Sequence, residues 1–194
     1  MEASYARGEP KLVGFVSADG KRWELAKSDP LLTDGQFDSL NVVLWDSLRA
    51  SYIAIYRKSR HGVRSVRYSS TRDFRDWPEG HWTEFGDSPA EHLYTNATAP
   101  YFRAPHIYLA FPRRFLPWRT LPLYQDLILP RASDVVIMSS RDGIHWDRRF
   151  LEAFIRPGRD TRNWTHQTKP LIFDGENLIL HFATPAAGST QLEI

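Results

Sequence analysis

The chain has 194 residues, of which 42% are hydrophobic and 25% are charged, and it contains no cysteine. These proportions are typical of a globular domain and unlike those of disordered or collagen-like chains. The net charge of +2 argues against a nucleic acid or an acidic membrane as partner. Without cysteine, disulfides, thiol catalysis and cysteine-ligated zinc are excluded. No apolar run is long enough to span a membrane, and the N-terminus lacks the apolar region of a signal peptide.

Short apolar runs, bounded by proline, glycine and other turn residues, predict strands rather than helices. Segment 121–129 is the best candidate for a short helical insertion. The predicted strands cover residues 40–45, 52–56, 107–111, 134–138 and 178–182.

A turn of the form Ser-x-Asp-Gly-x-x-Trp repeats along the chain. Asp-Gly favours a tight turn with a positive φ, and the serine and aspartate side chains can bond the turn amides. The tryptophan is expected to cover the turn from the returning strand. The middle copy has Phe74 in place of glycine and therefore needs a different turn. The copies are residues 17–23, 69–77 and 140–146.

Strand–turn–strand units alternate with these turns, so that two successive hairpins make one four-stranded antiparallel sheet. Repetition of such sheets at a period of about 50 residues indicates the blades of a β-propeller. We therefore predict an all-β fold with a single partial propeller domain over residues 1–194. Because closed propellers have about 4–8 blades, we expect a fragment of a longer protein. The predicted divisions are 1–30 (second half of a blade), 31–86 (a blade), 87–155 (a blade with an insertion at 112–130) and 156–194 (first half of a blade).

The repeated turn, set between strand pairs such as Tyr-Ile-Ala-Ile-Tyr-Arg at 52–57, resembles the five-bladed propeller glycoside hydrolases of families 32, 43, 62 and 68. The chain is most similar to the uncharacterised bacterial family-32-like proteins. The resemblance implies a five-bladed parent with about three blades present here, and hydrolysis of a glycosidic bond in a poly- or oligosaccharide. It also implies that no cofactor is needed and that the parent protein is extracellular or periplasmic.

In that superfamily, three carboxylates surround a central funnel at the starts of the innermost strands of consecutive blades. Such carboxylates act as acid and as nucleophile or base. The resemblance places Asp38 at the position of the aspartate that stabilises the transition state. At the position of the acid glutamate the chain has Thr95, and Glu91 is the nearest carboxylate. The equivalent position in the last blade is occupied by His166, and the nucleophile would belong to an absent blade.

Two candidate catalytic residues have competing interpretations. Asp38 either contacts sugar or simply opens a strand through an Asx-turn. Glu152 lies in an apolar stretch, where burial would raise its pKa and suit it to be an acid. The alternative is a surface glutamate paired with Arg148 or Arg156.

Polar and aromatic side chains near the predicted funnel are candidates for sugar contacts. Amide and imidazole groups would bond sugar hydroxyls, tryptophan would stack on a sugar ring, and arginine would bind an acidic substituent. Trp118 in the insertion is a further stacking candidate. The predicted substrate-binding residues are Asn41, Asn96, Arg103, Trp164 and His166.

Three functions stay open from the sequence. The first is a glycoside hydrolase, with Asp38, Glu91 and Glu152 as candidate catalytic residues. The second is a propeller that binds a carbohydrate or a protein without cleaving it, which the threonine at position 95 favours. The third is a sialidase-like hydrolase, which would need three arginines clustered in the funnel. The histidines show no metal-ligand spacing, so no metal site is predicted.

Overall fold

The computed structural model describes residues 2–4, 9–118 and 132–156, and the strand residues 167–168, 172–173, 178–184 and 188–193. The described residues form strands and turns without a helix, so the all-β prediction is confirmed. It follows that no helix in this part of the chain could cross a membrane. The predicted helical insertion at 121–129 lies outside the described residues.

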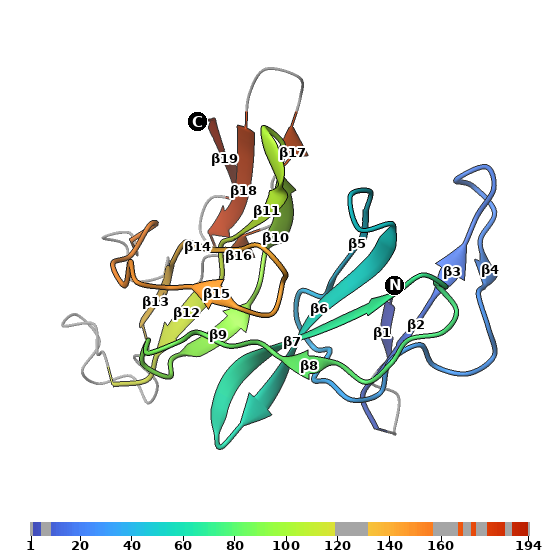
Figure 1. Cartoon of the computed structure of the whole chain (residues 1–194), viewed down its shortest axis with the longest axis horizontal. Helices are drawn as coiled ribbons and strands as arrows, with labels where there is room; N and C mark the ends of the chain where they lie inside the picture. The colour runs from blue at the N-terminus through green and yellow to red at the C-terminus, as the bar shows by residue number, and fades with distance from the viewer. Residues whose placement is uncertain are drawn as a thin grey trace.

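A four-stranded antiparallel sheet occupies the centre of the molecule and follows chain order (Figure 1). Long strands rich in Ile, Val and Tyr form its middle, as expected for residues that fit a pleated surface. A tight turn with positive φ at His61 and Gly62 joins the two longest strands. The strands are β5 (Val42–Asp46), β6 (Ser51–Arg60), β7 (Val63–Thr71) and β8 (His81–Trp82).

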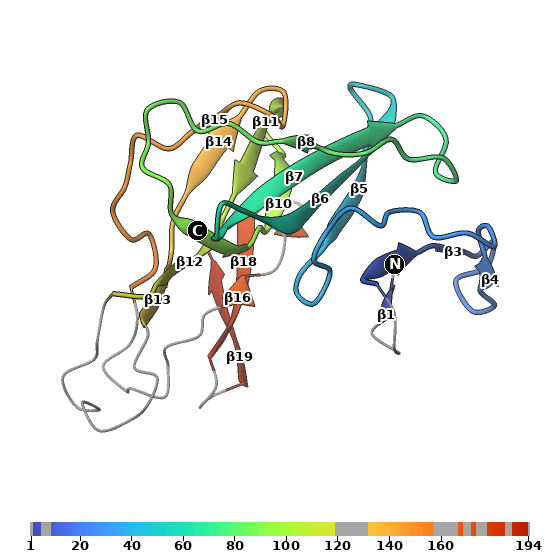
Figure 2. The same ribbon diagram turned by 90° about the horizontal axis from the view of Figure 1, so that it is seen from below.

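A second four-stranded antiparallel sheet lies beside the first (Figures 1 and 2). It differs because the chain leaves it after its second strand and returns for the third. The strands are β10 (Thr98–Tyr101), β11 (Ala104–Ala110), β14 (Met138–Ser140) and β15 (Trp146–Asp147).

The excursion between β11 and β14 forms part of a three-stranded sheet of its own, in the order β13-β12-β9. These strands are β9 (His92–Thr95), β12 (Arg113–Leu116) and β13 (Ala132–Val135). The predicted single strand 134–138 is therefore wrong, since the chain changes sheets at Val136 and Ile137. The backbone amide of Val135 bonds Ile155 O and that of Val136 bonds Pro112 O. These bonds satisfy the backbone where the ladder is interrupted.

Two two-stranded sheets lie near the N-terminus, and a four-stranded sheet lies near the C-terminus. At the N-terminus β1 (Glu2–Ser4) pairs with β2 (Lys11–Val13), and β3 (Phe15–Val16) pairs with β4 (Glu24–Leu25). Near the C-terminus β18 (Leu178–Thr184) pairs with each of β16 (Gln167–Thr168), β17 (Ile172–Phe173) and β19 (Gly188–Glu193). The sheets agree with the predicted four-stranded antiparallel unit. Their arrangement as blades of a partial propeller stays a prediction.

Strand β6 separates two apolar cores. Successive side chains of a strand point to opposite faces, so Ile53 and Ile55 pack toward the second sheet, against a cluster that includes Tyr108, Met138 and Trp146. On the other face, Ala54 and Tyr56 pack against a cluster that includes Leu12, Phe37 and Trp77. Burial on both faces of this part of β6 explains its continuous apolar run from Tyr52 to Tyr56.

The repeated turns form as the sequence predicts. In the last copy, Asp142 Oδ1 accepts hydrogen bonds from the amides of Ile144 and His145, each at 2.8 Å. Ser140 Oγ accepts one from Gly143 at 2.8 Å, and Gly143 has a φ of 82°. In the first copy, Asp19 makes the same pair of amide bonds to the residues that follow its glycine.

The expected role of the turn tryptophan is right in two copies and wrong in one. Trp146 and Trp77 are 3% and 8% exposed, and each indole donates to the backbone of its own turn. Trp23 is 61% exposed, so its indole is not buried over the turn. Its turn joins β3 to β4 in a two-stranded sheet at the edge of the molecule (Figure 1).

Candidate functional site

Asp38 lies on a loop that buried neighbours hold at the start of β5. Phe37 is 1% exposed and packs on Tyr56, with ring centres 5.4 Å apart. Asn41 donates from Nδ2 to the carbonyls of Phe37 and Ser39, at 3.1 and 2.9 Å. The predicted sugar contact Asn41 thus braces the loop, while the Asp38 side chain is 43% exposed.

Arg57 is the direct partner of Asp38. It continues the row of Ile53 and Ile55 on the face of β6 that points toward the second sheet, and it is 7% exposed. Its Nη2 donates to Asp38 Oδ1 in an ion pair. Its Cζ lies 4.7 Å from the centre of the Tyr94 ring on β9. A buried guanidinium therefore joins the loop carboxylate to an aromatic ring of the next sheet.

A cavity of about 370 Å³ opens at this point, and polar side chains dominate its wall. Antiparallel neighbours run in opposite directions, so the start of β5, the end of β6 and the start of β7 share one end of the sheet. Ser59 and Arg64 are cross-strand partners in that ladder, so both lie on the face of Arg57. The lining residues are Gln36, Asp38, Arg57, Ser59, Gly62, Arg64 and Tyr94.

Three guanidinium groups surround the ring of Tyr94. The Cζ atoms of Arg57, Arg64 and Arg113 lie 4.7, 5.2 and 5.0 Å from its centre. Burial lowers the pKa of Arg113, and the nearby Arg64 lowers it further, yet arginine stays charged at neutral pH. His92, whose Nδ1 accepts from the Arg64 amide at 3.3 Å, has its pKa lowered by burial and by Arg64. His92 is therefore neutral at pH 7 and leaves the cluster cationic.

The predicted acid Glu91 lies outside this cavity, in a buried ion network. Its carboxylate pairs with Arg114 at 3.0 Å and also with Arg148, and its side chain is 11% exposed. Arg114 in turn holds Asp134 at 2.7 Å. These ion pairs connect the sheet of β9, β12 and β13 to the segment after β15. They give Glu91 a structural role. Its catalytic role stays a prediction.

The other predicted site residues are dispersed. Asn96 is 4% exposed, accepts from Thr98 through Oδ1, and has a buried Nδ2 without a partner in the described structure. Arg103 is exposed in the turn between β10 and β11, against Phe102. Glu152 is exposed, so the burial expected from its apolar neighbours is not found. Trp164 and His166 lie outside the described residues.

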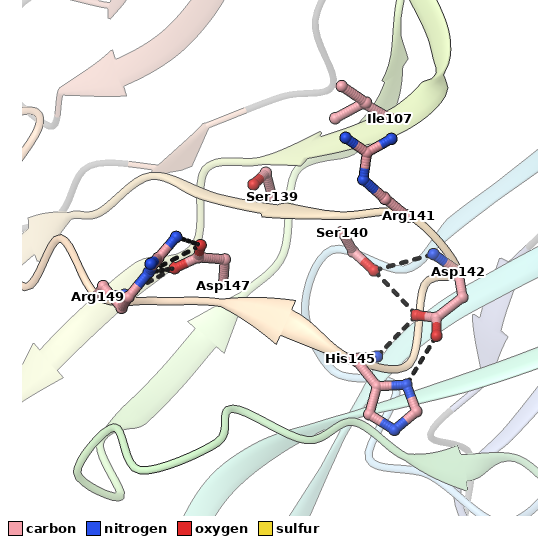
Figure 3. A pocket seen from close by; sticks show the side chains of 8 residues that line it. All are labelled: Ile107, Ser139, Ser140, Arg141, Asp142, His145, Asp147 and Arg149. Carbon is pink, nitrogen blue, oxygen red and sulfur yellow. Dashed lines mark hydrogen bonds and ion pairs between the residues drawn. The ribbon is translucent and has the colours of Figure 1, made fainter.

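A second cavity, of about 450 Å³, surrounds the turn after β14 (Figure 3). Its acidic groups are bonded to their own turn, as Figure 3 shows: Asp142 to Ser140 and His145, and Asp147 to Arg149. Burial opposes ionisation of Asp142, but hydrogen bonds from the His145 side chain and backbone outweigh it and lower the pKa to about 2. These bonds shape the turn. Across the described residues, no group of His, Asp and Glu could hold a metal ion.

Tyr94, Arg64 and Arg113 were not among the site residues predicted from the sequence. For Arg64, strand alternation could have predicted its position: it pairs with Ser59, and Ser59 lies on the same face of β6 as Arg57 because the two are two positions apart. No such signal exists for Tyr94 and Arg113. They belong to β9 and β12, whose register shifts between Arg113 and Arg114, and this irregularity sets where the ring and the guanidinium point.

Two solved structures that share this fold are carbohydrate-processing enzymes. A glycosyl hydrolase from Bacteroides ovatus superposes with a TM-score of 0.60 at 12% identity, over 90% of this chain and 52% of that one. An N-acetylgalactosamine deacetylase from F. plautii, solved with blood group B trisaccharide, superposes with a TM-score of 0.53 at 11% identity, over 90% and 51%. The chain thus spans about half the length of each. No protein-family model matches the sequence, and no curated protein matches it either.

Proposed function

We propose that this chain is part of a glycoside-hydrolase-like protein that binds a poly- or oligosaccharide in the Asp38 cavity. The observation that carries the proposal is the position of Asp38, on the wall of a polar cavity beside Arg57 and Tyr94. Residue types of this kind, a carboxylate, an amide and hydroxyls around an aromatic ring, are those that bind sugars. The resemblance to propeller hydrolases and the likeness to two carbohydrate-processing enzymes support it.

Asp38 would act as an ionised carboxylate beside the sugar. An aspartate is ionised at neutral pH, and the ion pair with Arg57 fixes its orientation. A fixed negative charge stabilises the positive charge that develops on a sugar ring as its glycosidic bond breaks. Arg57 is a positioning residue in this scheme. The propeller of the parent protein, which would place further groups around the funnel, belongs to the same proposal.

Binding without cleavage is the second candidate function. Glycoside hydrolysis normally uses two carboxylates, and among the described residues Asp38 is the one carboxylate that lines the cavity. Hydrolysis therefore requires a second acid from outside the described residues. Sugar binding requires none.

The test compares wild type with Asp38→Asn, and with Asp87→Asn as a matched control at an exposed loop position. Arabino-, fructo- and galacturono-oligosaccharides serve as probes, with reducing-sugar release and calorimetric binding as readouts. We expect Asp38→Asn to lower turnover by about 100-fold and Asp87→Asn to leave it unchanged. Binding without turnover, weakened by Asp38→Asn alone, would select the binding module. Equal activity and binding of Asp38→Asn and wild type would overturn the proposal.

A further inference from the structure

The cavity carries an excess of positive charge that the proposed function does not use. Arg57 and Arg113 place two positive charges against Tyr94, and Asp38, the one carboxylate that lines the cavity among the described residues, offsets only one of them. Beside them, His92 is neutral at pH 7 because burial and Arg64 lower its pKa.

Two of these guanidinium groups are more than nine-tenths buried and only partly satisfied. Arg57 and Arg113 are 7% and 8% exposed, and in each the Nε donor has no hydrogen-bond acceptor in the described structure. Arg57 has Asp38 as its counter-ion, whereas Arg113 forms no ion pair with a carboxylate of the described residues. Arg114, the next residue, has two such partners, Asp134 and Glu91. Of these two neighbours in sequence, it is Arg113, with its guanidinium over the Tyr94 ring, that lacks a carboxylate partner among the described residues.

Buried cations are costly unless an anion or a polarisable group compensates them. Contact with the Tyr94 ring offsets part of this cost. An external anion bound nearby would offset the rest of the free-energy cost of burying this charge. Arginine side chains bind planar carboxylates and sulfate oxygens through paired N–H donors, and they do so most strongly where water is scarce.

We propose that the cavity binds the oxyanion of an acidic sugar, a carboxylate or a sulfate substituent, with Arg64 and Arg57 as its contacts. Arg113 acts through Tyr94, by raising the positive potential behind the ring. This inference rests on the proposed function and narrows it to acidic saccharides. Asp38 borders the same cavity, so the oxyanion binds on the side of Arg57 that Asp38 does not occupy.

The experiment measures binding of trigalacturonate, a sulfated galacto-oligosaccharide, neutral maltotriose and inorganic sulfate to the 194-residue chain by calorimetry. We expect at least one acidic saccharide to bind about tenfold or more tightly than maltotriose, and this preference to shrink with added salt. The stronger of the two acidic probes identifies the oxyanion. Equal affinity for acidic and neutral saccharides would overturn the inference and leave the proposed function standing.

Arg64→Gln tests the contact, with Arg60→Gln as its matched control. Both arginines belong to the β6–β7 hairpin, but Arg60 is exposed and stacks on Trp82 instead of lining the cavity. We expect Arg64→Gln to weaken acidic-sugar binding about tenfold and Arg60→Gln to leave it unchanged. Equal effects of the two variants would refute the assigned contact. Binding of sulfate that depends on Arg64, without binding of any saccharide, would support the oxyanion site and overturn the proposed function.

Discussion

Tyr108 of β11 donates a hydrogen bond from its hydroxyl to Oδ2 of Asp46, although 62 positions separate the two residues in sequence. Asp46 ends β5, so this bond joins the two four-stranded sheets at the end opposite the Asp38 cavity. Arg49 completes the joint, with Nη1 at 2.6 Å from the carboxylate and 3.1 Å from the hydroxyl. Burial and the bond to Asp46 raise the pKa of Tyr108, so its hydroxyl remains a donor.

Removing that hydroxyl should destabilise the protein. Tyr108 is 0% exposed and Asp46 is 2% exposed, so Tyr108→Phe leaves a buried carboxylate short of one donor. We expect the free energy of unfolding to fall by about 1–3 kcal/mol in urea denaturation. Tyr52→Phe is the control, since the Tyr52 hydroxyl makes no hydrogen bond with the described residues. Equal stability of the two variants would show that the bond to Asp46 contributes nothing.

The two turn glycines should respond differently to alanine. Both have a positive φ, 71° at Gly20 and 82° at Gly143, so each substitution incurs backbone strain of about 1 kcal/mol. A Cβ at Gly143 would also lie 2.4 Å from Cε2 of Tyr68, whereas one at Gly20 would meet nothing within 4 Å. Thermal unfolding should therefore show a clearly larger loss for Gly143→Ala. A larger loss for Gly20→Ala would contradict the packing around the last turn.

Replacing Glu91 and replacing Glu152 should have different effects on the stability of the protein, because Glu91 belongs to a buried ion network and Glu152 is exposed. Glu91→Gln breaks the pairs with Arg114 and Arg148, and it leaves the buried Arg148 without a carboxylate partner among the described residues, while Arg114 keeps Asp134. Breaking a buried pair typically costs about 3–5 kcal/mol, so this variant should unfold at much lower urea concentration. Glu152→Gln, at an exposed position, should unfold as wild type does. A Glu91→Gln variant of wild-type stability would show that the network is not needed for the fold.

Two histidines should titrate on opposite sides of the ordinary histidine pKa of 6.5. The hydrogen bond to Asp142 raises the pKa of His145, and burial together with Arg64 lowers that of His92. His145 therefore adds stability below pH 6.5 that is lost as pH rises through its higher folded value. The contribution of neutral His92 is present above pH 6.5 and is lost as pH falls toward its lower folded value.

Side-chain NMR resolves both titrations. Asp142→Asn should bring the His145 pKa down toward 6.5 and leave His92 unchanged. A His145 titration unaffected by Asp142→Asn would mean that the hydrogen bond between them does not form in solution.

The sequence was sufficient for features that local chemistry controls. The turn at 140–146 needs only its own Ser, Asp, Gly and Trp side chains, and its bonds form as expected. Strand β18 lies close to its predicted bounds because its apolar run is continuous, whereas β6 extends to Arg60, beyond the predicted end of its apolar run at Tyr56. By contrast, the break after Val135 depends on backbone partners at Pro112 and Ile155, which no local pattern specifies.

The candidate site was only partly predictable for the same reason. Asp38 was identified because the resemblance to propeller hydrolases implies an aspartate at this position before the predicted strand, and a position along the chain can be read from the sequence. The rest of the cavity depends on how β9 lies against β7. Tyr94 on β9 contacts Arg57 on β6, so this contact joins two different sheets. The orientation of Tyr94 depends on the register shift between β9 and β12 at Arg113 and Arg114.

Soaking crystals of the chain with trigalacturonate would show whether the Asp38 cavity binds an acidic sugar. We expect a sugar ring in the cavity beside Asp38 and Tyr94, with a carboxylate bonded to Arg64 or Arg57. An ordered sugar at the Asp142 turn instead, with the Asp38 cavity empty, would contradict this expectation.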